Sequence, residues 1–135
     1  MRLFHLSEDK NLTVLTPRVP ETAVSLYENV VTPRVCFAKS ISGCLSALQG
    51  IPCTYYVYMP IIEGQDFHIP TVNEVRDGRI NGEVWCMNEV KVQCIGKIKC
   101  SNWNKKKEYF VERKQGKKEL VVRYFYPWKW VEKYF

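Results

Sequence analysis

Two ionisable side chains of this chain of 135 residues belong to apolar segments, one inside its segment and one at the head of its segment. His5 lies within LFHLS near the beginning, and Glu83 comes directly before VWCMNEVKV. An imidazole and a carboxylate are common proton-transfer groups, and a carboxylate also stabilises developing positive charge. Either residue alone also fits a structural role, as a core histidine or as a solvent-facing strand residue. What they do depends on whether the fold brings them together.

The hydrophobic pattern predicts strands for most of the chain. Short apolar and aromatic segments of the kind that form strands cover residues 2–6, 32–38 and 54–60. Pro17 and Pro20 predict a loop after the first strand. Residues 61–82 carry Pro70 and three glycines, and a stretch of that length without regular structure is typical of a functional loop.

The C-terminal half predicts a long strand followed by a hairpin. Residues 83–100 alternate in polarity, with a break or bulge expected near Asn88 and again near Gly96. Residues 106–126 contain two alternating runs, and Gly116 marks the turn between them.

One segment, SISGCLSALQG, has helical periodicity. Its apolar residues recur at the spacing of one helix face: Ile41, Cys44, Leu45 and Leu48. Ser40 can cap the N-terminus and Gly50 can close the C-terminus. The expected fold class is therefore α+β, with a mostly antiparallel, split mixed sheet, one or two helices and a basic C-terminal β-hairpin. The length predicts a single domain over 1–135, in which 1–100 form the core and 101–135 the basic, aromatic hairpin and tail.

Composition narrows the class of protein. Hydrophobic residues make up 46% of the chain, but no apolar run approaches the roughly 18–20 residues of a membrane helix. The start MRLFHLSEDK lacks the apolar core of a signal peptide, so we expect a cytoplasmic protein. The sequence contains six cysteines but no CxxC pair, and its two histidines are far apart. Reduced thiols and no metal site are therefore expected.

Positive charge is concentrated at the C-terminal end. Residues 1–96 contain 8 Lys and Arg against 10 Asp and Glu, a balance of −2, whereas residues 97–135 contain 12 against 4, a balance of +8. With its interleaved aromatic residues, the segment 97–135 could bind nucleic acid or an acidic protein. The alternative is a solvated hairpin whose lysines prevent edge-to-edge aggregation.

The order of these features resembles the ADP-ribosyltransferase fold, in particular small bacterial or phage proteins of the His-aromatic-Glu type. FHLS is similar to the first-strand His-x-Ser/Thr of that family. VCFAKSIS resembles its second strand and the serine-bearing helix that follows, and EVWCMNEVKV resembles its Glu-headed strand. The resemblance covers about residues 3–98 and leaves the basic hairpin unmatched. It implies NAD as a substrate, with rifampin ADP-ribosyltransferases and RNA 2′-phosphotransferases as related activities.

The resemblance gives His5 and Glu83 the central roles. His5 would hydrogen-bond a ribose hydroxyl of NAD, and Ser7 would point to the same side because strand side chains alternate. Glu83 would stabilise the cationic sugar that forms as nicotinamide leaves, and would accept the proton of an attacking group. Phe37, or Cys36 beside it, would lie near the nicotinamide ring.

The same resemblance implies polar contacts to the rest of the dinucleotide. Ser40 or Ser42, at the start of the helix, would bond the carboxamide or a phosphate. Arg18 and Arg34 would hold the pyrophosphate, because a planar guanidinium matches phosphate oxygens in pairs.

The sequence also departs from the family pattern. Cys36 stands where the family has a tyrosine, and Asn81 stands where arginine-modifying members have a second acid, which leaves Asp66 as an alternative acid. RNA 2′-phosphotransfer needs several cations, for which only Arg18, Arg34 and His68 are available. The acceptor of any transferred group is not predicted. The other hypothesis is a binding module without catalysis, which contacts nucleic acid or an acidic partner through 97–135.

Overall fold

A computed structural model describes residues 2–20, 31–48, 53–61, 66–71, 73–74, 82–103, 106–113, 118–123 and 135. Within these ranges the chain forms eight strands and one helix. In chain order they are β1 (His5–Ser7), β2 (Val14–Leu15), β3 (Val35–Ala38), α1 (Ile41–Ala47), β4 (Thr54–Pro60), β5 (Glu83–Cys86), β6 (Val90–Trp103), β7 (Lys106–Arg113) and β8 (Lys118–Arg123).

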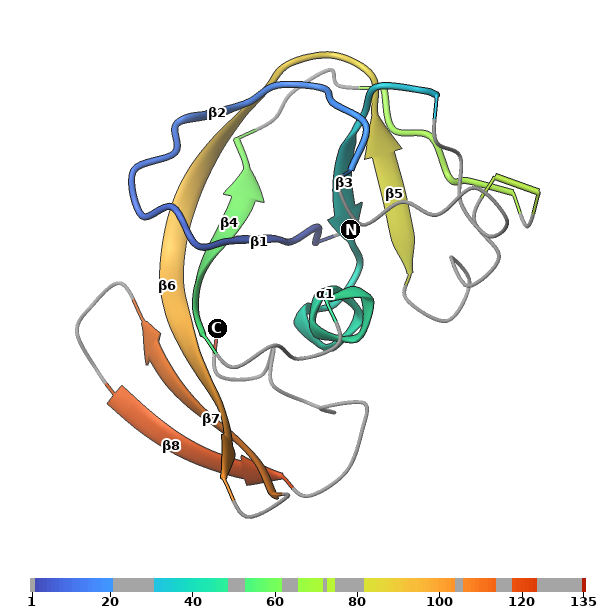
Figure 1. The fold of residues 1–135 in the computed structure, drawn as a ribbon. Coiled ribbons are helices and arrows are strands. Elements are labelled where there is room, and N and C mark those ends of the chain that lie inside the picture. The colour runs from blue at the N-terminus through green and yellow to red at the C-terminus, as the bar shows by residue number, and fades with distance from the viewer. Residues whose placement is uncertain are drawn as a thin grey trace.

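The strands form two sheets. In the larger one β1, β4, β6, β7 and β8 are neighbours in that order, and β2 pairs with the beginning of β6. The smaller sheet contains β3 and β5 alone, and Figure 1 shows it standing beside β4 and β6. The α+β class and the split, mostly antiparallel sheet are therefore confirmed.

The prediction of a mixed sheet is wrong for the part of the chain that the structure describes, where every strand pair is antiparallel. Parallel neighbours need a crossover connection of a dozen or more residues, usually a helix. The single described helix, α1, has seven residues and leads from the small sheet to β4.

A backbone bridge between Phe4 and Ala38 joins the two sheets. The amide of Phe4 donates to the carbonyl of Ala38 at 2.8 Å, and the reverse bond measures 2.9 Å. Because Phe4 precedes β1 and Ala38 ends β3, this bridge brings the beginning of the chain against the strand that carries Cys36 and Phe37. It therefore fixes where His5 lies relative to β3 and β5.

The helix begins as the sequence predicts. The hydroxyl of Ser40 accepts a hydrogen bond from the amide of Gly43 at 2.9 Å, which is an N-cap contact. Ile41 and Leu45 are fully buried, and Cys44 is nearly so. The predicted apolar face is thus the face that packs, and α1 lies below β3 in Figure 1.

Two groups of buried side chains form the core. The first packs α1 against β1, β4 and β6: Phe4, Leu6, Ala38, Ile41, Cys44, Leu45, Tyr55, Val57, Ile98 and Cys100. The second fills the space between the small sheet and the larger one: Leu3, Leu15, Val35, Phe37, Tyr58, Val84, Cys86, Val90 and Val92. Burial of this apolar surface is the main term that holds the two sheets together.

The strand after Glu83 is interrupted at both predicted places. β5 ends at Cys86 and β6 begins at Val90, which confirms the break near Asn88. Val57 then pairs with Gly96 but Tyr58 pairs with Cys94, so Ile95 is the extra residue of a bulge.

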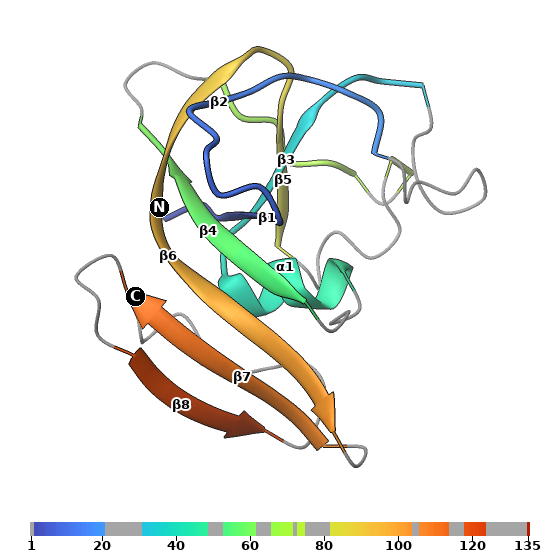
Figure 2. The same cartoon turned by 60° about the vertical axis from the view of Figure 1, so that its left-hand side comes forward.

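The C-terminal hairpin forms between β7 and β8, and Figure 2 shows the two strands continuing the sheet along the far part of β6. Its predicted turn at Gly116 lies outside the described residues. Among the residues that are described, no helix is long and apolar enough to span a membrane.

Candidate functional site

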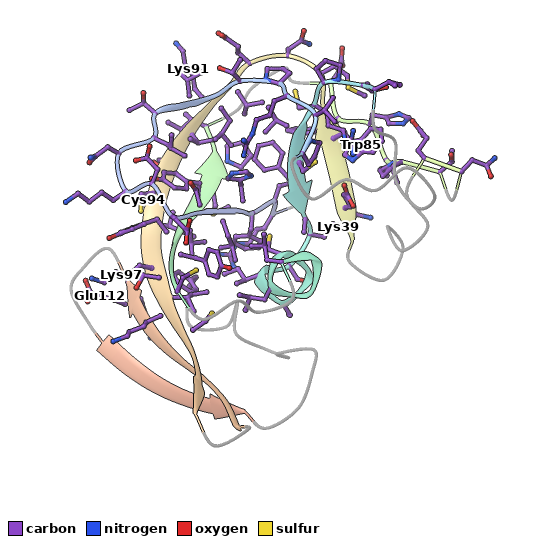
Figure 3. The ribbon with its side chains drawn as sticks, viewed as in Figure 1. Lys39, Trp85, Lys91, Cys94, Lys97 and Glu112 are labelled. Atoms are coloured by element: carbon purple, nitrogen blue, oxygen red, sulfur yellow. The ribbon has the colours of Figure 1, made fainter. Side chains whose placement is uncertain are left out.

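The pairing of β3 with β5 sorts the predicted site residues onto two faces. Cys36 lies opposite Trp85 and Ala38 lies opposite Glu83, so these side chains share one face of the small sheet. Phe37 pairs with Val84 on the other face, which belongs to the core between the sheets. Trp85 is labelled at β5 in Figure 3.

Glu83 is oriented by Trp85. The indole Nε1 of Trp85 donates a hydrogen bond to Oε1 of Glu83 at 2.8 Å, while Glu83 itself is partly exposed. Trp85 is fully buried, so its own position is fixed by packing. One carboxylate oxygen is therefore held by the protein, and the carboxylate has a defined direction.

A cation and a histidine contact the ring of Trp85. The guanidinium carbon of Arg34 lies 4.2 Å from the ring centroid, which is cation–π geometry. The ring of His68 lies 5.7 Å away, and its Nε2 is 2.8 Å from Oε1 of Glu74. Arg34 is only 1% exposed and also donates to the carbonyl of Thr32 at 2.9 Å. Arg34 thus packs against Trp85, the residue whose indole orients Glu83. It does not face solvent, whereas an arginine that holds a pyrophosphate has to be accessible to it.

His5 is held against β3 from the other side. Its Nδ1 lies 2.8 Å from the carbonyl oxygen of Cys36, and its ring is 6.0 Å from the ring of Phe37. A carbonyl only accepts, so Nδ1 carries the proton and donates. Burial lowers the pKa of His5 below 6.5; the bond to Cys36 opposes this shift and the charge of Arg18 adds to it. The ring is therefore neutral near pH 7, and Nε2 presents a lone pair.

Cys36 connects His5 and Glu83. Its backbone carbonyl accepts the bond from His5, and its thiol interacts with the carboxylate of Glu83 and the guanidinium of Arg34. Burial and then the charge of Glu83 raise the pKa of this thiol to about 12. The thiol is therefore protonated near pH 7 and is not a nucleophile. His5 and Glu83 do not contact each other in the described part of the chain, but both contact Cys36.

The other predicted residues are distributed around this centre. Phe37 is 2% exposed, and its ring centroid lies 5.9 Å from that of Phe67 on the core face. The residue of β3 whose side chain lies beside Glu83 is therefore Cys36 and not Phe37. Arg18 is exposed and forms a backbone bridge with Arg34, with N–O distances of 3.1 and 3.0 Å. Its electrostatic effect on His5 places the two side chains near each other.

The serines have local partners. The hydroxyl of Ser7 accepts from the amide of Asp9 at 3.1 Å, and Ser40 caps α1. Ser42 is partly buried in the first turn of α1, and Asp66 is exposed. Among the described residues no cluster of three His, Cys, Asp or Glu side chains could hold a metal ion.

Trp85 and Glu74 are two residues of the site that the sequence analysis does not predict. Trp85 could have been found, because a residue two positions after Glu83 on a strand lies on the same face. Glu74 belongs to a turn in which its Oε1 also accepts from the amide of Thr71 at 3.0 Å, and no periodic pattern marks such a residue.

The basic segment contributes one described ion pair. Nζ of Lys97 lies 3.6 Å from Oε2 of Glu112 across β6 and β7, and both are labelled in Figure 3.

Comparison with known proteins gives no relative: no family model matches the chain, and neither a curated protein nor a solved structure matches it.

Proposed function

We propose that this chain is an NAD-dependent ADP-ribosyltransferase, or an NAD-binding relative, of ADP-ribosyltransferase-like fold. The observation that carries the proposal is the contact of both His5 and Glu83 with Cys36. The imidazole bonds the backbone carbonyl of Cys36 and the carboxylate contacts its thiol, so the two groups approach one residue of a short strand from different directions. These are the two groups that the resemblance requires at the sugar of NAD.

The neutral state of His5 suits the ribose. With Nδ1 bonded to the carbonyl of Cys36, Nε2 accepts a hydrogen bond from a ribose hydroxyl. The short strand β1 and the backbone bridge at Phe4 keep the ring in place, so little order has to be gained when the ligand binds. Arg18, exposed and close to His5, is the cation best placed for a phosphate of the same ligand.

Glu83 acts on the leaving step. The bond between C1′ of the sugar and the nicotinamide nitrogen breaks, and nicotinamide leaves with the electron pair. The positive charge that develops on the sugar is stabilised by the carboxylate, whose direction is set by Trp85. A nucleophile then forms the new bond to C1′ and loses its proton to Glu83 or to solvent. With water as the nucleophile, the products are ADP-ribose and free nicotinamide.

The acceptor is a protein, a nucleic acid or a small molecule. Asn81 precedes Glu83 by two residues, which does not favour an arginine acceptor. RNA 2′-phosphotransfer is less well supported, because burial removes Arg34 from the small set of available cations. We place the proposed activity in the cytoplasm, where thiols such as those of the six cysteines are kept reduced.

The decisive experiment measures nicotinamide release from NAD by the purified protein. We expect release by the wild type and a loss of about 100-fold or more in Glu83→Gln, because the variant lacks the negative charge but keeps the shape. Glu89→Gln is the matched control, since Glu89 is exposed in the turn between β5 and β6. Equal release by the wild type and Glu83→Gln would exclude Glu83 from the reaction.

The alternative is a non-enzymatic binding module. The balance of +8 over residues 97–135 is the observation that favours it. If neither the wild type nor Glu83→Gln releases nicotinamide, and the protein binds nucleic acid with an affinity that falls steeply with salt, the basic hairpin is the functional element. Binding to an acidic protein in the same salt series would identify the other partner class.

A further inference from the structure

Cys53 directly precedes β4 and lies next to Cys100 of β6, the neighbouring strand of the larger sheet. Thr54 pairs with Lys99, and the same register continued by one residue sets Cys53 opposite Cys100. The amide of Cys100 donates to the carbonyl of Cys53 at 2.8 Å. Residues directly opposite each other on antiparallel strands have Cα atoms about 4.5–5.5 Å apart, and their side chains lie on one face. Disulfides span Cα separations of about 4.4–6.8 Å.

The surroundings confirm that the two thiols share a face. Cys100 is 5% exposed and belongs to the first core group, and the partly buried Cys53 packs against that group. Burial, followed by the proximity of Cys53, raises the pKa of Cys100 to about 12. Burial raises the pKa of Cys53 as well; the hydrogen bond with Tyr55 opposes this rise and the exposed Glu8 adds to it. Both thiols are therefore protonated near pH 7, so their reaction with a peroxide is slow at neutral pH and faster in alkali. Because Cys53 is the less buried of the two, it is the member of the pair that a reagent in solvent reaches first.

We propose that Cys53 and Cys100 form a reversible cross-strand disulfide when the protein meets a peroxide. The sulfur of Cys53 attacks one peroxide oxygen, the O–O bond breaks, and Cys53 becomes a sulfenic acid with release of one water. The sulfur of Cys100 then attacks the sulfur of Cys53 and displaces a second water. Two thiols and one hydrogen peroxide give one disulfide and two waters, so the peroxide is reduced and the sulfurs are oxidised.

The remaining cysteines are worse placed to compete. The thiol of Cys44 donates to the carbonyl of Phe4 at 3.3 Å, and that of Cys94 donates to the carbonyl of Gly96 at 3.3 Å. Cys36 pairs with Trp85 and Cys86 pairs with Val35, so these two side chains point to opposite faces of the small sheet. Cys53 and Cys100 are the two cysteines that the strand register sets face to face.

The bridge is expected to be easily reduced. The Cβ atoms of residues opposite each other on antiparallel strands are about 4.5–5.5 Å apart, whereas disulfides favour about 3.8 Å. Closing the bond therefore strains the strands, and strained disulfides have higher reduction potentials. The bond would form under oxidative stress and open again when thiol reductants recover.

The test uses the purified full-length protein treated with hydrogen peroxide, blocked with N-ethylmaleimide and digested. Mass spectrometry should detect a peptide pair linked through Cys53 and Cys100, which a dithiol reductant separates. Cys94→Ser, on the same strand as Cys100, is the matched control and should keep the link. A predominant link between any other two cysteines, or no intramolecular link at all, would overturn the proposal. No turnover of NAD enters this measurement, so its result is independent of the proposed function.

Single variants test the order of the two steps. In Cys100→Ser the reaction should stop at the sulfenic acid of Cys53, which dimedone labels. In Cys53→Ser the buried Cys100 should remain unlabelled under the same treatment. Labelling of Cys100 in Cys53→Ser, with none of Cys53 in Cys100→Ser, would contradict the assigned order.

Discussion

The indole nitrogen of Trp85 donates a 2.8 Å hydrogen bond to the carboxylate of Glu83, two residues earlier on the same strand. The donor is fully buried and the acceptor is partly exposed, so the bond connects the packed interior to a group that a ligand can reach. Arg34 lies against the ring of Trp85, and the thiol of Cys36 lies beside Glu83. The direction of the carboxylate is therefore set by side chains that would not themselves touch NAD.

Under the proposed function, Trp85→Phe should lower nicotinamide release about 10- to 100-fold with little change in the KM for NAD. Phenylalanine keeps a ring at this buried position but has no N–H, and a hydrogen bond to a charged group contributes about 1.5–3 kcal/mol. The measurement is release by Trp85→Phe, Glu83→Gln and the double variant. In the double variant Trp85→Phe should cause no further loss, because the group that it orients is already neutral. The same additional loss in both backgrounds would mean that Trp85 acts through packing alone.

The depressed pKa of His5 predicts a loss of stability in mild acid. Burial keeps the folded pKa below 6.5, so the unfolded chain binds a proton more readily than the folded one. The contribution of His5 to the free energy of unfolding should thus be constant above pH 6.5. It should fall as the pH drops below 6.5, by up to about 1.4 kcal/mol per pH unit. Glu74, whose pKa is lowered from 4.5 by the amide of Thr71 and by His68, adds its own loss only below pH 4.5.

His5→Asn isolates this effect. The asparagine amide can replace Nδ1 as the donor to Cys36 but does not titrate. Urea unfolding between pH 4.5 and 6.5 should therefore have a smaller slope in the variant than in the wild type. Identical slopes would show that His5 does not carry the pH dependence in this range.

The raised pKa of Cys36 predicts a loss of stability at high pH, in contrast to the loss at low pH that His5 predicts. Its pKa is raised from 9.0 to about 12, so the folded state holds the proton more tightly than the unfolded state. The stability that the protonated thiol contributes is complete below pH 9 and falls as the pH rises from 9 towards 12, by about 1.4 kcal/mol per pH unit at most. Cys100, raised to about 12 by burial, adds a similar loss.

Comparison of the wild type with Cys36→Ala separates the two thiols. The wild type should lose stability faster than the variant above pH 9, because Cys36→Ala removes the contribution of Cys36 and leaves those of Cys100 and Cys53 unchanged. Chemical unfolding at pH 8, 9 and 10 gives the difference. A difference between the two proteins that does not change with pH would exclude Cys36 as the titrating group.

The elements of the core could be predicted from local patterns. The helix over Ile41–Ala47 carries its apolar face and its Ser40 cap in one short stretch of sequence. The break after Cys86 and the bulge at Ile95 are marked by neighbouring polar residues and a glycine. In each case the residues that decide the structure lie within a few positions of one another, so the sequence displays them together.

The contacts of the site depend on strand register, which the sequence does not display. Cys36 faces Glu83 and Phe37 faces the core because β3 pairs with β5 in one register, and a shift of one residue would exchange them. Arg34 could be predicted as a cation but not as a buried one, since its burial depends on Trp85, about fifty positions later in the chain. The positions of His5 and Glu83 could be proposed from order alone, but their common partner, Cys36, could not.

Gly96→Ala should cost about 3 kcal/mol or more of unfolding free energy. Gly96 has a φ of 157°, and a Cβ atom there would clash with the carbonyl oxygen of Glu112 and lie 2.6 Å from the ring of Phe135. The carbonyl belongs to a paired strand and cannot move away without breaking the register of β6 and β7. Gly82→Ala is the comparison: its φ is 66° and its nearest contact would be Cβ of Lys39 at 3.3 Å, so about 1–2 kcal/mol is expected. Thermal or urea unfolding of both variants ranks the two costs. If Gly82→Ala lowers the free energy of unfolding more than Gly96→Ala does, the close approach of β6 and β7 beside the bulge at Ile95 is not what makes Gly96 necessary.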